Sequence, residues 1–221
     1  MKGVQKEAVK YKIEVDEVSK SFGSQKVLDE VSLNIEYGEI CGIVGNNGSG
    51  KSVLFKCICG LLFADEGEIT VDGKLLHKDM DMVTDAGVII EEPAFLAGAS
   101  GYKNLDYLYG IRNKRDKAYI ESILELVGLD PKSKKHVKNY SMGMKQRLAI
   151  AQAIMEKPSL LILDEPMNGL DKTAVGEMRE LFKKINSEGT TIIVASHNQA
   201  DIDILCNHVY EMDAGKLTMI R

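Results

Sequence analysis

The first part of the chain alternates between apolar and polar positions. Two runs repeat with a period of two, which is the spacing of side chains on one face of a strand. Their apolar members are Tyr11, Ile13 and Val15, followed by Val27, Val31, Leu33 and Ile35. Gly23 and Gly38 stand at turn positions. The pattern predicts an antiparallel β-sheet near the N-terminus.

Several later segments are apolar without alternation, which is typical of strands buried on both faces. They cover residues 39–44, 87–90, 160–164 and 190–196. Helical periodicity lies between them, with one helix predicted from about 52 to 62 and another over 172–187. Strands that alternate with helices predict a parallel sheet covered by helices.

From about residue 99 to 155 the pattern is helical throughout. One apolar face there consists of Tyr119, Ile120, Ile123, Leu124 and Val127. Gly128 ends that helix and Pro158 stops the next one. At 221 residues the chain has room for one domain with a substantial core. We therefore predict a single α/β domain, residues 1–221, with a helical subdomain inserted at about 92–157.

Composition narrows the possible functions. The 33 Asp and Glu exceed the 28 Lys and Arg, so the net charge of -5 argues against a nucleic-acid partner. No apolar run approaches the roughly 20 residues that span a bilayer, and MKGVQKEAVKYKIEV lacks the apolar stretch of a secretory signal. We expect a cytosolic protein with reduced thiols. Cys41, Cys57, Cys59 and Cys206 lie among apolar neighbours and should be buried.

The segment GNNGSGKS follows the strand at 39–44 and precedes a predicted helix, which is the order that a phosphate-binding loop requires. Its backbone amides would wrap a polyphosphate, Lys51 would reach the β- and γ-phosphates, and Ser52 would offer Mg²⁺ a hydroxyl. The strand context predicts a P-loop NTPase core. The candidate nucleotide-binding residues here are Gly45, Asn46, Asn47, Gly48, Ser49, Gly50, Lys51, Ser52 and Val53.

Two carboxylates follow the strand LLIL, at the sheet edge where open α/β sheets bind ligands. Asp164 is a candidate metal ligand through water, and Glu165 is placed to orient or deprotonate an attacking water. His197 follows another strand and could hydrogen-bond the γ-phosphate or that water. Glu165, His197 and Lys51 are therefore the candidate catalytic residues of a phosphoryl-transfer site.

The order of these motifs resembles that of the ATP-binding cassette (ABC) family, from Tyr11 to Lys216. Phe22 looks like the family's adenine-stacking aromatic, and YSMGMKQR at 140–147 resembles the signature LSGGQ, with Met142 and Met144 as departures. The resemblance implies that Ser141 and Gly143 face ATP bound by a second copy. The segment NGLD at 168–171 resembles the family's D-loop, and the resemblance makes Asp171 a candidate nucleotide-binding residue. ATP, Mg²⁺ and an ATP-dependent homodimer are therefore expected.

A second departure lies in GVIIEEPAF, where Glu91 follows the strand in place of the family's usual Gln. Glu91 is therefore a further candidate catalytic residue and a candidate metal-site residue beside Ser52 and Asp164, and we expect it to couple ATP hydrolysis to a membrane-embedded partner. The stretch resembles the subgroup for bacteriocin, lantibiotic and peptide-antibiotic export or immunity. That resemblance implies a separately encoded transmembrane permease and a place on the inner face of the cell membrane.

Two other functions fit parts of the sequence. Asn113-Lys114-Arg115-Asp116 matches the N-K-x-D guanine motif of GTPases, but it follows a helix-like segment where guanine readers have a buried strand. The other alternative is a soluble cassette ATPase, for example in iron–sulfur assembly. Such proteins usually carry tandem cassettes, coiled-coil inserts or basic arms, and this chain shows none of these features.

Overall fold

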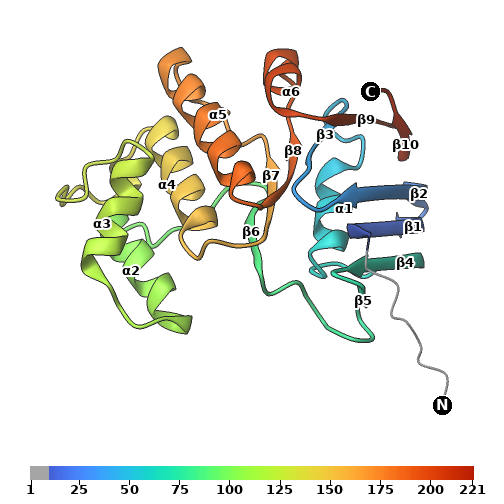
Figure 1. The fold of residues 1–221 in the computed structure, drawn as a ribbon, viewed down its shortest axis with the longest axis horizontal. Helices are drawn as coiled ribbons and strands as arrows, with labels where there is room; N and C mark the ends of the chain where they lie inside the picture. Colours follow the sequence, from blue (N-terminus) through green and yellow to red (C-terminus); the bar gives the residue numbers. More distant parts are fainter. Residues whose placement is uncertain (1–9) are drawn as a thin grey trace.

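The computed structural model describes residues 10–221, and it contains two sheets (Figure 1). The first is antiparallel, with the order β2-β1-β4-β5. Its strands are β1 (Tyr11–Phe22), β2 (Gln25–Glu36), β4 (Glu66–Val71) and β5 (Lys74–Leu75). Gly23 turns β1 into β2 with a positive φ of 61°. The predicted N-terminal antiparallel sheet is confirmed.

The second sheet has six strands in the order β10-β9-β3-β8-β7-β6, and only β10 runs antiparallel to its neighbour. Its strands are β3 (Ile40–Val44), β6 (Ala86–Ile89), β7 (Leu160–Asp164), β8 (Thr191–Ala195), β9 (His208–Asp213) and β10 (Lys216–Met219). The strands β3, β8 and β7 therefore end at the same edge of the sheet. Motifs far apart in the sequence meet there.

Both faces of this sheet are buried, and successive residues of each central strand belong to different cores. Leu160 and Ile162 of β7 pack into the core under the antiparallel sheet. Leu161 and Leu163 pack into the core shared with the helices on the other face. Burial on both faces contributes roughly 2 kcal/mol for each such side chain. This explains the continuous apolar runs in the sequence.

The helical insert lies between β6 and β7, on the left in Figure 1. It contains α2 (Gly101–Arg112), α3 (Lys117–Leu126), a short 3-10 helix (Val137–Asn139) and α4 (Met142–Ile154). The three α-helices begin after polar caps, Ser100, Asp116 and Ser141, whose side chains accept hydrogen bonds from backbone amides. A helical subdomain inserted in the α/β core is thus confirmed.

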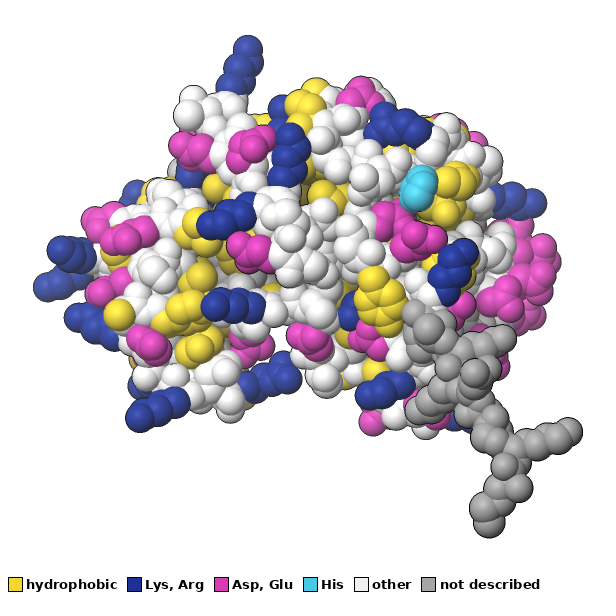
Figure 2. Space-filling view, in the orientation of Figure 1, with side chains coloured by type: hydrophobic (Ala, Val, Ile, Leu, Met, Phe, Trp, Pro, Cys, Tyr) yellow, Lys and Arg dark blue, Asp and Glu magenta, His cyan; other side chains and the backbone are white. Residues whose placement is uncertain are grey.

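Charge is divided unevenly between the insert and the rest of the chain. Residues 92–157 contain 12 Lys and Arg against 7 Asp and Glu, although the whole chain is acidic. Figure 2 shows Lys and Arg side chains gathered at the end formed by α2 and α3, and a group of acidic side chains at the far end near β1 and β2. The insert is therefore the basic part of the molecule.

The helix predicted over 172–187 is confirmed as α5 (Lys172–Ser187), the elements after β8 were not predicted, and one helix ends earlier than expected. The helix α1 (Lys51–Ile58) stops before residue 62 because Gly60, at φ 77°, turns the chain and Leu61 N donates to Lys56 O. The helices α5 (Lys172–Ser187) and α6 (Gln199–Leu205) complete the cover of the sheet. Among the described residues, no helix combines the length and the apolar character needed to cross a membrane.

All four cysteines are free. Cys41, Cys57 and Cys59 are buried as the sequence predicted, whereas the prediction was wrong for Cys206, which is only partly buried at the C-terminal end of α6. Burial raises the pKa of the Cys57 thiol to about 11 and the pKa values of Cys59 and Cys206 to about 12. Burial also raises the pKa of Cys41 well above its usual value. The native thiols are therefore protonated and unreactive at neutral pH.

This predicts slow alkylation of the folded protein. At pH 8 and in the absence of urea, iodoacetamide should modify Cys57 and Cys59 at least about a hundredfold more slowly than in urea, because a pKa raised by two units or more removes most of the thiolate. Mass spectrometry of timed samples measures the rates. Rapid modification while circular dichroism shows a folded chain would contradict the buried assignment.

Candidate functional site

The loop between β3 and α1 has the tight geometry that its glycines permit. Gly45, Gly48 and Gly50 have φ values of 151°, 79° and 115°. An added Cβ at Gly45 would lie 2.2 Å from Met212 O, and one at Gly50 would lie 2.8 Å from Val27 O. A Cβ at Gly48 would meet nothing within 4 Å. The loop is therefore packed on its inner side and open on its outer side.

The loop also leaves polar groups that suit an anion. Lys51 is 7% exposed, and its Nζ donates to Gly45 O at 2.7 Å and to Asn46 O at 3.0 Å. The Ser49 hydroxyl is buried and has no hydrogen-bond partner in the described part of the chain. Such an unpaired buried group is costly. The loop thus contains a cation and a free donor for bound phosphates.

Ser52 and Asp164 come together at the end of β7. Ser52 Oγ donates to Asp164 Oδ2 at 2.5 Å. A hydroxyl and a carboxylate are hard oxygen donors of the kind that Mg²⁺ prefers. The described residues contain no group of three or more His, Cys, Asp or Glu side chains arranged to hold a metal. The pair therefore offers a Mg²⁺ two oxygen donors.

Glu165 is held on several sides at the same sheet edge. Its backbone adopts a left-handed conformation with φ 49°, and its amide donates to Ala195 O at 2.9 Å. Its Oε1 accepts a hydrogen bond from the His197 amide at 2.9 Å, and its Oε2 lies 2.8 Å from His197 Nδ1. The two predicted catalytic residues are therefore in direct contact, and the carboxylate is oriented by its neighbour.

A cavity of about 500 Å³ lies in front of these groups. Most of the predicted site residues line it: Asn47, Gly48, Gly50, Lys51, Ser52, Val53, Glu91, Asp164 and Glu165. Phe22 is not among the lining residues; it ends β1 with 51% of its surface exposed and with Lys20 Nζ 5.7 Å from its ring centre. The ring is thus half exposed and lies outside the residues that line the cavity.

Glu91 occupies the rim of the cavity and has a partner that the sequence did not indicate. It has φ 61°, and its Oε1 lies 2.5 Å from Lys56 Nζ. Its side chain remains 63% exposed. Lys56 lies near the end of α1, which begins with Lys51. The pair therefore links the phosphate-loop helix to the connection that leaves β6.

Ser141, Gly143 and Asp171 lie at the starts of two helices beside the cavity. Ser141 caps α4 and accepts a hydrogen bond from Met144 N at 3.2 Å. Asp171 caps α5 through Ala174 N at 2.9 Å. Both cap side chains are exposed, and an added Cβ at Gly143 would lie 2.9 Å from Gly169 O. The signature segment and the D-loop segment are thus in close contact.

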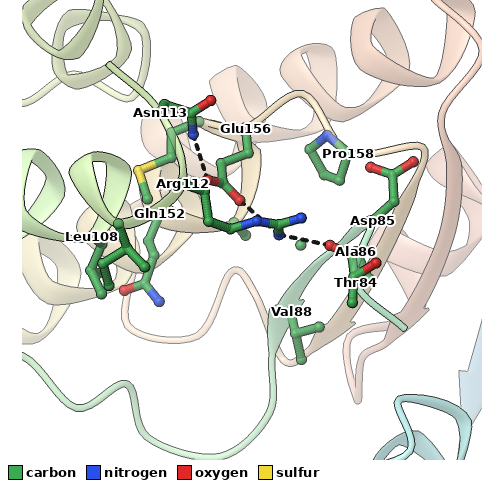
Figure 3. A pocket seen from close by; sticks show the side chains of 14 residues that line it. Thr84, Asp85, Ala86, Val88, Leu108, Arg112, Asn113, Gln152, Glu156 and Pro158 are labelled. Atoms are coloured by element: carbon green, nitrogen blue, oxygen red, sulfur yellow. Dashed lines mark hydrogen bonds and ion pairs between the residues drawn. The ribbon is translucent and has the colours of Figure 1, made fainter. Parts of the chain in front are cut away.

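A second cavity of about 490 Å³ lies at the amino ends of β6 and β7 (Figure 3). Arg112 Nη1 donates to Thr84 O at 2.9 Å, and Asn113 Nδ2 donates to Glu156 Oε1 at 2.8 Å. Asn113 opens the N-K-x-D segment. That segment therefore lies at the opposite edge of the sheet from the phosphate loop and does not contribute to the nucleotide site.

Comparison with known proteins decides the family. The sequence profile described as "ABC transporter" matches residues 28–168. The chain belongs to the ABC transporter family. It is 40% identical over 205 residues to the ABC transporter ATP-binding protein YybJ of Bacillus subtilis (strain 168), with 93% of this chain and 94% of that protein covered. An ATP-binding cassette binds ATP, and the phosphate loop described above lies within the matched residues.

Two further relatives carry names that specify a transported compound. The bacitracin transport ATP-binding protein BcrA of Enterococcus faecalis is 37% identical, with 95% of this chain and 68% of that protein covered. The lantibiotic transport ATP-binding protein SrtF of Streptococcus pyogenes is 34% identical, with 94% and 89% covered.

Solved structures share the fold. An ATP-binding subunit of an ABC transporter matches with a TM-score of 0.83 at 25% identity, covering 94% of this chain and 90% of that chain. A dimeric cassette bound to ADP and phosphate matches with a TM-score of 0.83 at 23% identity, covering 95% and 99%. The mixed α/β cassette architecture predicted from the motif order is therefore confirmed.

The geometry predicts that Lys51→Ala abolishes nucleotide turnover. The substitution removes the cation that reaches into the loop, so hydrolysis should fall at least about a hundredfold and ATP affinity should drop. Phosphate release and binding of a fluorescent ATP analogue measure the two effects. The control is Lys183→Ala, an exposed lysine on α5. Normal turnover by folded Lys51→Ala protein would refute this role.

Proposed function

We propose that this chain is the ATP-hydrolysing subunit of a transporter, and that two copies clamp two Mg-ATP molecules between them to drive a separate permease. The observation that carries the proposal is the meeting of Lys51, Ser52, Asp164, Glu165 and His197 at one edge of the sheet. A hydrolytic phosphoryl-transfer site needs a phosphate cradle, metal ligands and a carboxylate for water, and these residues supply all three.

Each residue has a distinct part in hydrolysis. When nucleotide binds, Lys51 exchanges its hydrogen bonds to the loop carbonyls for a contact with the phosphates, and it neutralises charge on the transferred phosphoryl group. Ser52 and Asp164 hold Mg²⁺, which when bound stabilises the charge on the phosphate oxygens. Glu165 orients the attacking water and takes its proton, while His197 keeps the carboxylate in place through Nδ1 and its amide. Phe22 stacks on the adenine ring.

The proposed dimer rests on an unused anion site. The start of α4 has backbone amides beyond the one bonded to Ser141 Oγ, and such amides at a helix N-terminus favour an anion. We assign this end of the helix to ATP held by the second copy. The structural neighbour described as a dimeric cassette with ADP and phosphate supports this arrangement.

We also assign the helical subdomain, which is inserted in the α/β core, to residues 92–157.

The proposed cargo is a peptide antibiotic, exported or removed from the membrane for self-protection. The support comes from the bacitracin and lantibiotic relatives and from Glu91 in place of the usual Gln. The permease would be encoded separately, and the chain would lie on the cytoplasmic face of the membrane. The soluble-cassette alternative loses support because the named relatives are transport proteins.

Glu165→Gln should trap a closed dimer around uncleaved ATP. The amide still accepts the hydrogen bond from His197 N but cannot take a proton from water. Gel filtration with Mg-ATP should show a dimer for Glu165→Gln and a return to monomer when Ser141→Arg is added. Ser187→Arg, at the exposed end of α5, is the matched control and should leave the dimer intact. A monomeric Glu165→Gln protein would count against the shared site.

Glu91→Gln should affect coupling more than nucleotide binding. The near-isosteric amide keeps its place on the rim but loses the charge that pairs with Lys56. We expect ATP affinity within about threefold of the parent and a clear loss of antibiotic resistance in cells that contain the permease. Glu92→Gln, at the adjacent exposed carboxylate, is the control. Unchanged resistance and hydrolysis in Glu91→Gln would show that the charge has no such role.

A further inference from the structure

The side chain of Gln146 connects the signature helix to the catalytic turn. Gln146 lies on the second turn of α4 and is half-buried. Its Nε2 donates to Pro166 O at 2.8 Å and approaches Glu165 O at 3.4 Å. These two carbonyls belong to the catalytic residue and to the residue after it. One amide group thus spans from the helical insert to the backbone that carries Glu165.

Backbone packing reinforces this connection. An added Cβ at Gly143 would lie 2.9 Å from Gly169 O, and an added Cβ at Gly169 would lie 2.7 Å from Met142 Cγ. The start of α4 therefore rests directly on the segment that runs from Glu165 to Asp171. A movement of this helix end toward that segment would therefore displace it, because the two backbones are in close contact.

The backbone that receives these contacts sets the direction of the catalytic carboxylate. Glu165 is in the left-handed region, and its carbonyl also accepts a hydrogen bond from Asn168 N at 3.1 Å. A small rotation of this peptide group would swing the side chain away from His197. Gln146 Nε2 contacts the carbonyls of Glu165 and Pro166, which are the peptide groups that such a rotation would turn.

We propose that Gln146 is a positioning residue that couples the two ATP sites of the dimer. The proposal rests on the shared-site function above. In that dimer the α4 start of one copy contacts ATP held by its partner, whereas Glu165 of the same copy acts on its own ATP. Gln146 transmits the docking of the signature segment at one site to the carboxylate of the other.

The contact requires a side chain that donates hydrogen bonds at this position. Both acceptors are backbone carbonyls, so the side chain must donate, which a Glu carboxylate cannot do and a Leu cannot do. Gln146→Leu and Gln146→Glu should therefore both impair hydrolysis. Loss of one such bond corresponds to about threefold to tenfold in kcat. The KM for ATP should stay within about twofold, because Gln146 donates to protein carbonyls.

Cooperativity in ATP concentration is the first readout. A two-site dimer can show a Hill coefficient of up to about two, and uncoupling the sites should bring it to about one in Gln146→Leu and Gln146→Glu. Gln152→Leu is the matched control, because Gln152 lies further along the same helix and lines the second cavity. The control should keep the parent Hill coefficient.

Mixed dimers test the direction of the effect. Two differently tagged copies are combined, one with Glu165 intact and one carrying Glu165→Gln, so that a single site retains the carboxylate. Gln146→Leu is then placed either in the intact copy or in the Glu165→Gln copy. The first arrangement breaks the link to the working carboxylate and should lower kcat about threefold to tenfold. The second should lower it less.

Each other outcome overturns the proposal. Equal falls in the two arrangements would mean that Gln146 only stabilises the helix, and a larger fall in the second would place its role at the phosphate. An unchanged kcat and Hill coefficient in Gln146→Leu would show that the contact affects neither hydrolysis nor the coupling between the two sites. A parent protein that neither dimerises with Mg-ATP nor hydrolyses it would instead refute the shared-site function itself.

Discussion

Parallel hydrogen bonding between β3, β8 and β7 brings three separate chain segments to one edge of the sheet. In the register of the strands, Ile43 and Asp164 both lie opposite Ala195. The phosphate loop, the carboxylate pair and the His197 loop therefore begin at the same level. The apolar side chains that bury both faces of these strands keep this register, since a slip by one residue would exchange the two cores.

Two residues at this edge of the sheet, Glu165 and Glu91, have strained backbone conformations, and they differ in the contacts that hold them. Glu165 and Glu91 each follow a strand and have positive φ values, which cost about 1 kcal/mol for a non-glycine residue. Glu165 is held by Ala195 O, by His197 and by Asn168 N. Among the described residues, the Glu91 side chain pairs with Lys56, and this exposed ion pair contributes little free energy. The catalytic turn is thus held by more hydrogen bonds than the Glu91 connection.

Residues that act through local sequence order were predictable, whereas those that act through tertiary contact were not. The phosphate loop and the pair Asp164-Glu165 follow from strand and turn patterns, and they lie where the sequence predicted. No local pattern indicates that Lys56 pairs with Glu91, which follows it by 35 residues, or that Gln146 reaches Pro166. The strands β9 and β10 were also missed, because β9 joins the sheet through β3, which lies far away in the sequence, and β10 pairs only with β9 in the described sheet.

A buried ion pair behind the site explains why His197 is fixed. Asp201, at the start of α6, is 2% exposed and accepts hydrogen bonds from Arg179 Nε and Ser196 Oγ, each at 2.9 Å. Ser196 Oγ in turn accepts from Asn198 N at 3.1 Å. A buried carboxylate is stable only when it is paired, so breaking this network costs several kcal/mol. The residues on both sides of His197 are therefore anchored to α5 and α6. Arg179, Ser196 and Asp201 therefore brace the loop that places His197 against the Glu165 carboxylate.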